Sequence, residues 1–352
     1  MPIKKILVPL DGSENAEKIG GWVTGLAVPL GAEIALITVV DPEKIELPQA
    51  TAAIGHQPEH PVPGRPGPYD RPAYGAPAMS SGGFTGIGDV MPGHGAEPEH
   101  PPAFGTQILD RIMQQASEYL EMEADRLNAS GVKSTTKALM GDPAEVIVEH
   151  ALEIKADLVA MATHRGSAIA RGVLGSVTDR VLRTASVPVM AVHPESLPAF
   201  TGAKGQPEVV VVPLDGSERS ASVVDTALEL AKACGSEVVF FRAVQYPYYG
   251  VTAVDAGYYG TDYGISYQRR EAEEYLEPFV DRAIAQGLSA RSVVSTGSPV
   301  HRLLDEVGAL PRPLIVMSTR GASGLKRWVL GSVADKVVRS SGLPVLVIPP
   351  QG

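Results

Sequence analysis

The stretch ILVPLDGSE at residues 6–14 returns as VVVPLDGSE at residues 210–218, a shift of 204 positions. Further along, VLGSV at residues 173–177 returns unchanged at residues 329–333, a shift of 156. A Gly-x-Pro turn and a closing apolar run with proline share this second shift. Matches that keep their order along a chain indicate two copies of one structural unit.

The first copy carries extra residues in its middle, because the two shifts differ by 48. The excess lies at Asp41–Gly105, which holds 13 of the 30 prolines and shows no hydrophobic periodicity. Such a segment buries too little apolar surface to offset the entropy of ordering, so we expect a disordered or loosely held loop. The matching loop of the second copy, Gln245–Tyr267, is shorter and rich in Tyr and Gly.

A length of 352 residues is typical of about two domains. We expect domain 1 at residues 1–194, with the insertion at 41–105, and domain 2 at residues 208–352. Residues 195–207, with Pro, Gly and Lys, are predicted to be the linker between them.

Apolar runs and helix-start signals alternate along each copy. In the second copy they predict strands near 209–214, 237–244, 290–295, 313–318 and 344–348, with helices beginning near Ser217, Ile265, Pro299 and Gly331. Regular alternation of strand and helix predicts a parallel sheet with helices on both faces. The fold class is therefore α/β, with a mainly parallel five-stranded sheet in each copy.

Composition narrows the classes of partner. The formal net charge is −10 without any Lys/Arg run, which disfavours nucleic acid and anionic membrane surfaces. Cys234 is the only cysteine, so one chain forms neither a disulfide nor a thiolate cluster, which fits the cytoplasm. Residues 20–40 are strongly apolar, but Pro29 and Gly31 break them, so a helix end, a turn and a buried strand are preferred over a membrane span. The histidines of the insertion are expected to be solvated, and no metal site is expected.

A glycine-rich segment, MSTRGASGLKRWVLGS at residues 317–332, follows the fourth strand of the second copy. In open parallel sheets, ligands bind beyond the carboxyl ends of the strands. Glycines allow close approach to a ligand, and Gly331-Ser332 opens a helix whose free N–H groups favour an anion. Arg320, Lys326 and Arg327 add positive charge to an otherwise acidic chain. The segment therefore predicts a phosphate-binding loop.

This segment resembles the signature of the universal stress proteins, which is glycine, two residues, glycine, nine residues, and glycine followed by Ser or Thr. The second copy keeps every spacing and replaces only the first glycine, by Ser318. The PLDGSE strand end and the Gly-x-Pro turn are also typical of that family, and the resemblance covers nearly the whole chain outside the insertion and the linker. It implies a Rossmann-like, adenine nucleotide alpha-hydrolase-like fold in each copy.

The resemblance also implies a ligand and a partner. ATP, with Mg²⁺, is the implied cofactor, and the two copies are implied to pack as a built-in pseudo-dimer through their last strands. A homodimer of chains and a further protein partner are compatible with the family.

The site residues follow the same resemblance, with adenine and ribose near Asp215 and phosphates over the glycine segment. In the second copy, the more favoured site, they are Pro213, Leu214, Asp215, Ala243, Val244, Gly297, Met317, Ser318, Arg320, Gly321, Gly324, Gly331, Ser332 and Val333. In the first copy they are Pro9, Leu10, Asp11, Val39, Val40, Gly141, Met161, Ala162, Arg165, Gly166, Gly175, Ser176 and Val177.

The first copy departs from the signature, since both leading glycines are missing and Arg165 stands where the second belongs. A residue other than glycine is costly where positive φ or close backbone approach is needed. Gly166 could replace the lost glycine after a one-residue shift, and Arg165 could itself pair with a phosphate. We therefore expect ATP mainly in the second copy.

Simpler interpretations exist for several of these residues. Asp11 and Asp215 could only start helices, and Gly141 and Gly297 could only form turns. Ser13 and Ser217 are predicted to be helix N-caps rather than nucleophiles, because no histidine repeats beside them.

Three functions compete at this stage. A regulatory module that binds ATP without turnover is favoured by the retained glycines, and a nucleotide-free interaction module by the altered first loop. An ATPase or nucleotidyl transferase is disfavoured because no Walker-type Gly-x-x-x-x-Gly-Lys-Ser/Thr loop follows a strand. Slow hydrolysis in a binding site stays open.

Overall fold

The computed structural model describes residues 2–45, 103–163, 174–193, 205–245, 259–319 and 330–350. The predicted insertion from residue 46 to residue 102, most of the predicted linker and the middle of both glycine segments lie outside these described residues. The chain divides into one unit of Met1–Ile45 with Leu109–Gly352 and another of Glu46–Ile108. Both copies of the sequence repeat lie in the former unit.

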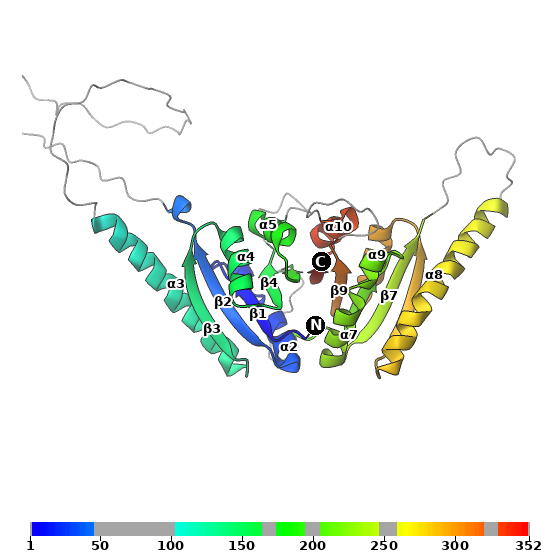
Figure 1. Ribbon diagram of the computed structural model, residues 1–352, viewed down its shortest axis with the longest axis horizontal. Helices are drawn as coiled ribbons and strands as arrows, with labels where there is room; N and C mark the ends of the chain where they lie inside the picture. Colours follow the sequence, from blue (N-terminus) through cyan, green and yellow to red (C-terminus); the bar gives the residue numbers. More distant parts are fainter. Residues whose placement is uncertain are drawn as a thin grey trace, which may run out of the picture. The chain divides into compact units, whose positions relative to one another are not determined.

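The first repeat contains five strands and the helices between them (Figure 1). Its strands are β1 (Lys5–Pro9), β2 (Glu33–Val40), β3 (Ser134–Met140), β4 (Leu158–Ala162) and β5 (Val189–Val192). Its helices are α1 (Glu14–Glu17), α2 (Gly20–Leu30), the 3-10 helix η1 (Pro42–Lys44), α3 (Ala103–Ala129), α4 (Pro143–Glu153) and α5 (Ser176–Thr184).

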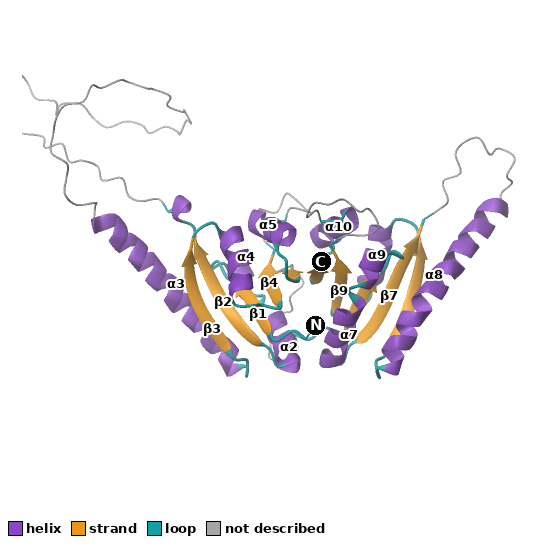
Figure 2. Cartoon of the chain, in the orientation of Figure 1, coloured by secondary structure: helices purple, strands orange, loops and turns teal. Residues whose placement is uncertain are grey.

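The second repeat has the same order of elements (Figure 2). Its strands are β6 (Val209–Pro213), β7 (Glu237–Val244), β8 (Ala290–Thr296), β9 (Pro313–Ser318) and β10 (Val345–Ile348). Its helices are α6 (Glu218–Ala221), α7 (Val224–Cys234), α8 (Tyr259–Ala285), α9 (Pro299–Val307) and α10 (Ser332–Ser340). The five predicted strands of this copy are confirmed to within one residue at each end.

All ten strands form one sheet in the order β3-β2-β1-β4-β5-β10-β9-β6-β7-β8. Neighbouring strands within each repeat are parallel, which confirms the predicted fold class. The repeats join where β5 pairs with β10 in the antiparallel sense, with Met190 opposite Leu346. The two predicted sheets therefore continue into one another through their last strands, as the family resemblance implied.

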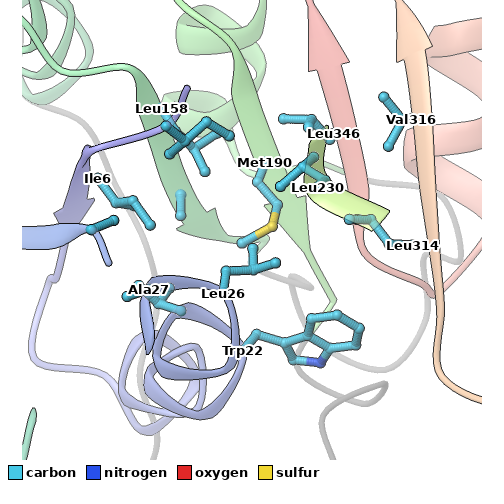
Figure 3. Close-up of a cluster of buried hydrophobic side chains, with 14 of the residues drawn as sticks. Ile6, Trp22, Leu26, Ala27, Leu158, Met190, Leu230, Leu314, Val316 and Leu346 are labelled. Atoms are coloured by element: carbon cyan, nitrogen blue, oxygen red, sulfur yellow. The ribbon is translucent and has the colours of Figure 1, made fainter. Parts of the chain in front are cut away.

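Two apolar layers cover the two faces of this sheet. The strands are rich in Val, Ile and Leu, and their side chains alternate between faces, so that Ile6 and Val8 belong to one layer and Leu7 to the other. The layer with α2 and α7 is continuous across the joint, because Leu26, Met190 and Leu346 belong to one buried cluster (Figure 3). The opposite layer is closed by α4, α5, α9 and α10.

The end of the predicted linker packs directly on the first repeat. A Cβ added to Gly25 of α2 would lie 2.2 Å from the carbonyl carbon of Gly205, and one added to Gly205 would lie 1.9 Å from the carbonyl oxygen of Gly21. Real Cβ atoms do not approach backbone this closely, so glycine is required on both sides of the contact. The backbone just before β6 is thereby held against α2.

Three sequence predictions about the loops need correction. Helix α8 begins at Tyr259 rather than near Ile265, so residues 259–267 are helical and not loop. Residues Asp41–Ile45, assigned to the insertion, form a 3-10 turn in which Asp41 accepts a hydrogen bond from the Glu43 N–H. At the other end of the insertion, Ala103–Gly105 belong to α3.

The apolar segment 20–40 forms α2, a left-handed cap at Gly31 and the strand β2, as predicted. Within the described part of the chain, no helix combines the length and the apolar character that crossing a membrane requires.

Candidate functional site

The carboxyl edge of the second repeat's sheet contains a cavity of about 280 Å³. It lies between the ends of β6, β7 and β9 and the helices α9 and α10. Its lining residues are Pro213, Leu214, Asp215, Ser220, Phe241, Ala243, Pro299, Leu303, Met317, Ser318, Gly331, Ser332, Val333 and Ala334. This is the edge at which open parallel sheets bind ligands. Aliphatic walls with a few polar groups are typical of small-molecule sites.

The turn after β6 fixes Asp215 at the cavity wall. Asp215 accepts hydrogen bonds from the Ser217 hydroxyl at 2.6 Å and from the Ser217 N–H at 3.0 Å. Ser217 in turn caps α6 by accepting from the Ser220 N–H at 3.1 Å, which confirms its prediction as an N-cap. Gly216 has φ of 92°, a left-handed conformation that favours glycine.

The repeat-related turn of the first repeat has the same geometry. Asp11 accepts from the Ser13 hydroxyl at 2.7 Å and from the Ser13 N–H at 3.1 Å. Ser13 accepts from the Ala16 N–H at 3.2 Å, so it is the cap that the sequence predicts. Both aspartates therefore shape their turns, and both are exposed residues that line a cavity.

Helix α10 begins at the same cavity. Gly331 is its N-cap residue and no side chain caps it, while Ser332 and Val333 line the cavity wall. The first N–H groups of a helix lack partners within that helix, and its dipole favours negative charge there. Helix α5 begins in the same way, with Gly175 as N-cap and no side-chain hydrogen bond.

A second cavity, of about 380 Å³, lies at the matching edge of the first repeat. Its lining residues are Pro9, Leu10, Asp11, Ala16, Val39, Asp41, Lys44, Ile45, Pro143, Ile147, Met161, Ala162, Val177 and Thr178. Shifts of 204 or 156 map most of these onto residues that line the cavity of the second repeat. The wall of the first repeat also includes Asp41, Lys44 and Ile45, and the positions that match Lys44 and Ile45 lie outside the described residues of the second repeat.

The predicted site residues divide into three groups. Those that line a cavity are Pro213, Leu214, Asp215, Ala243, Met317, Ser318, Gly331, Ser332 and Val333 in the second repeat, and Pro9, Leu10, Asp11, Val39, Met161, Ala162 and Val177 in the first. Those that are described but stand outside the lining are Val244, Gly297, Val40, Gly141, Gly175 and Ser176. Arg320, Gly321, Gly324, Arg165 and Gly166 lie outside the described residues.

The two glycines of the Gly-x-Pro turns have a conformational role. Gly141 and Gly297 adopt φ of 139° and 135°, which side chains rarely tolerate. A Cβ at Gly297 would also lie 3.0 Å from Nε of Arg302. The turn alone thus accounts for glycine at these positions.

Sequence reasoning missed several cavity residues, because they precede or follow the motifs. In the second repeat these are Ser220, Phe241, Pro299, Leu303 and Ala334, and in the first Ala16, Asp41, Lys44, Ile45, Pro143, Ile147 and Thr178. Ser220 was accessible to sequence reasoning, since it follows the repeated PLDGSE motif by two residues.

Behind the Asp215 turn, the second repeat has a cation that the first lacks. The guanidinium carbon of Arg242 lies 4.6 Å from the ring centroid of Tyr275, and Nη2 of Arg242 lies 3.0 Å from where a Cβ on Gly216 would be. Burial, above all, raises the pKa of the Tyr275 hydroxyl. The first repeat has Thr38 at the position of Arg242. The turn after β1 therefore lacks the arginine that lies beside the turn after β6.

Among the described residues, no group of three or more His, Cys, Asp or Glu side chains is placed to hold a metal ion.

The fold defines a class of protein with tandem α/β repeats of Rossmann-like type. Each repeat has a cavity at the carboxyl edge of its part of the sheet. The family model of the universal stress proteins matches residues 90–193 and again residues 207–349. The chain therefore belongs to the universal stress protein family.

Individual relatives agree with this assignment. A universal stress protein of Bacillus subtilis is 31% identical over 143 residues, which cover 40% of this chain and 97% of the relative. A universal stress protein of Mycobacterium tuberculosis is 26% identical over 251 residues, 70% of this chain and 80% of the relative. The crystal structure of a universal stress protein from Archaeoglobus fulgidus covers 98% of both chains with a TM-score of 0.61 at 21% identity, which shows the shared fold.

Proposed function

We propose that this chain is a non-catalytic regulatory protein that binds ATP at the carboxyl edge of the second repeat. The observation that carries the proposal is the coincidence of the cavity with the repeated motifs. Asp215 belongs to the PLDGSE motif, Ser318 and Ser332 stand near the two ends of the glycine-rich segment, and all three line one cavity. Aliphatic walls suit a nucleobase, and the uncapped start of α10 suits a phosphate.

Mg²⁺ enters this proposal as a companion of the phosphates. Asp215 is the only carboxylate among the described residues of the cavity wall. Mg²⁺ commonly keeps several waters and binds through substrate phosphates with one or two carboxylates. Mg²⁺ held mainly by the nucleotide is therefore the arrangement that this wall supports.

The side chains that line this cavity also favour a regulatory role over catalysis. General acid–base chemistry needs positioned titratable groups near the reacting atoms. Among the described residues that line the cavity of the second repeat, Asp215 is the only one with an acidic or basic side chain. We propose that ATP acts by changing the conformation or the association of the chain, and that any hydrolysis is slow.

The alternative is an interaction module of the same fold that binds no nucleotide. The observation in its favour is the first repeat's loop, where Arg165 replaces a signature glycine. This alternative predicts that neither repeat retains a nucleotide.

The test compares two repeat-related variants, Asp215→Ala and Asp11→Ala, by calorimetric titration with ATP and Mg²⁺. The two aspartates make the same pair of hydrogen bonds to the serine two residues on, so both variants perturb their turns alike. We expect Asp215→Ala to weaken ATP binding by about 10-fold or more, as loss of a charged hydrogen-bond partner typically does, and Asp11→Ala to leave it nearly unchanged. Equal affinities in both variants and in the wild type would remove the second repeat as the site.

The proposal extends to the domain organisation of the chain. We propose two domains divided at residues 195–207, which the two family matches on either side of residues 194–206 support. Cytoplasmic location and self-association into a homodimer stay predictions, as does a protein partner.

A further inference from the structure

The two cavities share most of their lining positions but differ at four repeat-related residues, at three of which the charge changes. These are Asp41, Asp142, Glu145 and Arg180 in the first repeat, and Gln245, Ser298, His301 and Lys336 in the second. At these positions the first repeat has three carboxylates and one guanidinium. The second repeat has one ammonium and three groups without formal charge, with histidine counted as neutral.

In the first repeat the basic residue at the rim is neutralised. Nη1 of Arg180 lies 2.7 Å from Oδ2 of Asp142, and Nη2 lies 3.1 Å from Oε1 of Glu145. Asp142 also caps α4 by accepting from the Glu145 N–H at 3.0 Å. These bonds lower the pKa of Asp142, so it is a carboxylate at neutral pH. Pro143, directly after it, lines the cavity.

A further carboxylate belongs to the cavity wall itself. Asp41 is 16% exposed at its side chain and pairs with Nζ of Lys44 at 3.0 Å, whose side chain is 73% exposed. Both residues line the cavity of the first repeat. The Asp41 carboxylate is therefore largely buried at the cavity wall, and the Lys44 ammonium that pairs with it is exposed to solvent.

In the second repeat the corresponding rim is open to an anion. Ser298 is the N-cap residue of α9 and makes no side-chain cap hydrogen bond. Within the described residues, Lys336 makes no ion pair, and no carboxylate occupies the position of Asp142 or Glu145. Pro299 and Ala334, which neighbour Ser298 and Lys336, line the cavity. A chain of phosphates at this position would meet the ammonium of Lys336, which makes no ion pair with another described residue.

We infer that the first-repeat cavity takes a nucleoside carrying at most one phosphate, whereas the second-repeat cavity takes the triphosphate. The inference rests on the proposed nucleotide binding and adds the ligand class of the first cavity. Carboxylates accept hydrogen bonds from ribose hydroxyls and from an exocyclic amine, but they repel phosphates. One chain would then bind both the triphosphate of a nucleoside and the same nucleoside with one phosphate or none.

The test uses full-length variants in which one cavity is filled. Val39 and Ala243 are repeat-related, half-buried wall residues at strand ends, so Val39→Trp fills the first cavity and Ala243→Trp the second. Each variant is titrated calorimetrically with adenosine, AMP and ATP in EDTA, because Mg²⁺ would mask the charge difference between the ligands. Circular dichroism and thermal unfolding establish that both variants are folded.

We expect affinity to rise with phosphate number in Val39→Trp and to fall or stay level in Ala243→Trp. From the charge difference, we expect the ratio of ATP to AMP affinity to differ between the two cavities by about 10-fold or more. Equal ratios in the two variants would overturn the inference while leaving the proposed function intact. Absence of all binding to the wild type, in EDTA and with Mg²⁺ alike, would overturn both.

A second set of variants avoids bulky side chains. Asp142→Ser, Glu145→His and Arg180→Lys together give the first rim the residues of the second, and Ser298→Asp, His301→Glu and Lys336→Arg do the reverse. We expect the first triple variant to raise the ATP to AMP ratio at the first cavity and the second to lower it at the second cavity, each by several-fold. Unchanged ratios in both would show that these rims do not select the ligand.

Discussion

Arg183 of the first repeat donates a hydrogen bond to Asp335 of the second, with Nη2 3.1 Å from Oδ1. The repeat-related bond runs the other way, from Nη2 of Arg339 to Oδ1 of Asp179 at 2.5 Å. Each arginine also pairs with the aspartate of its own helix, Arg183 with Asp179 and Arg339 with Asp335. The four residues close a ring between α5 and α10 where the repeats meet (Figure 1).

This ring stands one turn from both candidate sites. Val177 and Val333 line their cavities, and Asp179 and Asp335 follow them by two residues on the same helices. A ligand that shifts the start of one helix would therefore move a charge bonded to the other. The ring therefore bonds the helix that begins at one cavity to the helix that begins at the other.

The first prediction concerns the strength of this ring. We expect a double-mutant cycle with Arg183→Met and Asp335→Asn to give a coupling energy of about 1 kcal/mol, since the side chains are only partly exposed and each charge has two partners. Urea denaturation measures it. The pair Arg269–Glu273, 4.0 Å apart and exposed on α8, is the control, and we expect little coupling there. A ring coupling no larger than the control would contradict the prediction.

The second prediction is a pH dependence of stability. The hydrogen bond from Arg183, above all, lowers the pKa of Asp179 from its ordinary value of 3.8. A carboxyl group whose pKa is lower in the folded state than in the unfolded state stabilises the fold at pH values above the unfolded-state pKa. This contribution is lost as the pH falls through the folded-state pKa. Below pH 3.8 the free energy of unfolding should thus fall more steeply in the wild type than in Asp179→Asn. Parallel pH profiles from denaturant titration would show that Asp179 is not stabilised by the ring.

The third prediction concerns the contact between Gly25 and Gly205. A methyl group at Gly25 would lie 2.2 Å from the carbonyl carbon of Gly205, so Gly25→Ala must displace backbone. We expect a loss of about 1–3 kcal/mol in the free energy of unfolding, as overpacking typically causes. Gly20→Ala in the same helix meets nothing within 4 Å and should be neutral or slightly stabilising. Equal stabilities of the two variants would mean that the backbone contact is absent in solution.

The fourth prediction uses the single cysteine. Burial raises the pKa of Cys234 from 9.0 to about 11. The thiolate is the reactive form, so at pH 8 its population in the folded chain should be about 100-fold below that of an ordinary thiol. We expect slow reaction with a disulfide reagent in buffer and fast reaction in urea. A folded-state rate close to the unfolded rate would show that Cys234 is accessible.

The sheet could be predicted from sequence because its strands are short runs of Val, Ile and Leu bounded by turn residues. Both apolar layers follow from strand alternation, as Leu7 between Ile6 and Val8 illustrates. The start of α8 could not be predicted, since Gly260 and Gly264 obscure helical periodicity among the tyrosines. The pairing of β5 with β10 came from family resemblance, because neither strand carries a local signal for its partner.

The candidate site was predicted only where motifs mark it. Asp215 and Gly331 stand in repeated motifs and Ser318 stands in the family signature, and all three line one cavity. Asp41 and Lys44 were assigned to the proline-rich insertion, because composition cannot show that the first residues of that segment form a 3-10 turn and line the cavity. The ring of Asp179, Arg183, Asp335 and Arg339 depends on how the repeats meet, which no local pattern encodes.

The central claim is that the second repeat binds ATP, and calorimetric titration of the nucleotide-free full-length chain with ATP and Mg²⁺ tests it most directly. The account predicts saturable binding with one ATP per chain. No heat at two temperatures, together with no retention of ATP in equilibrium dialysis, would contradict it and leave the interaction module as the function.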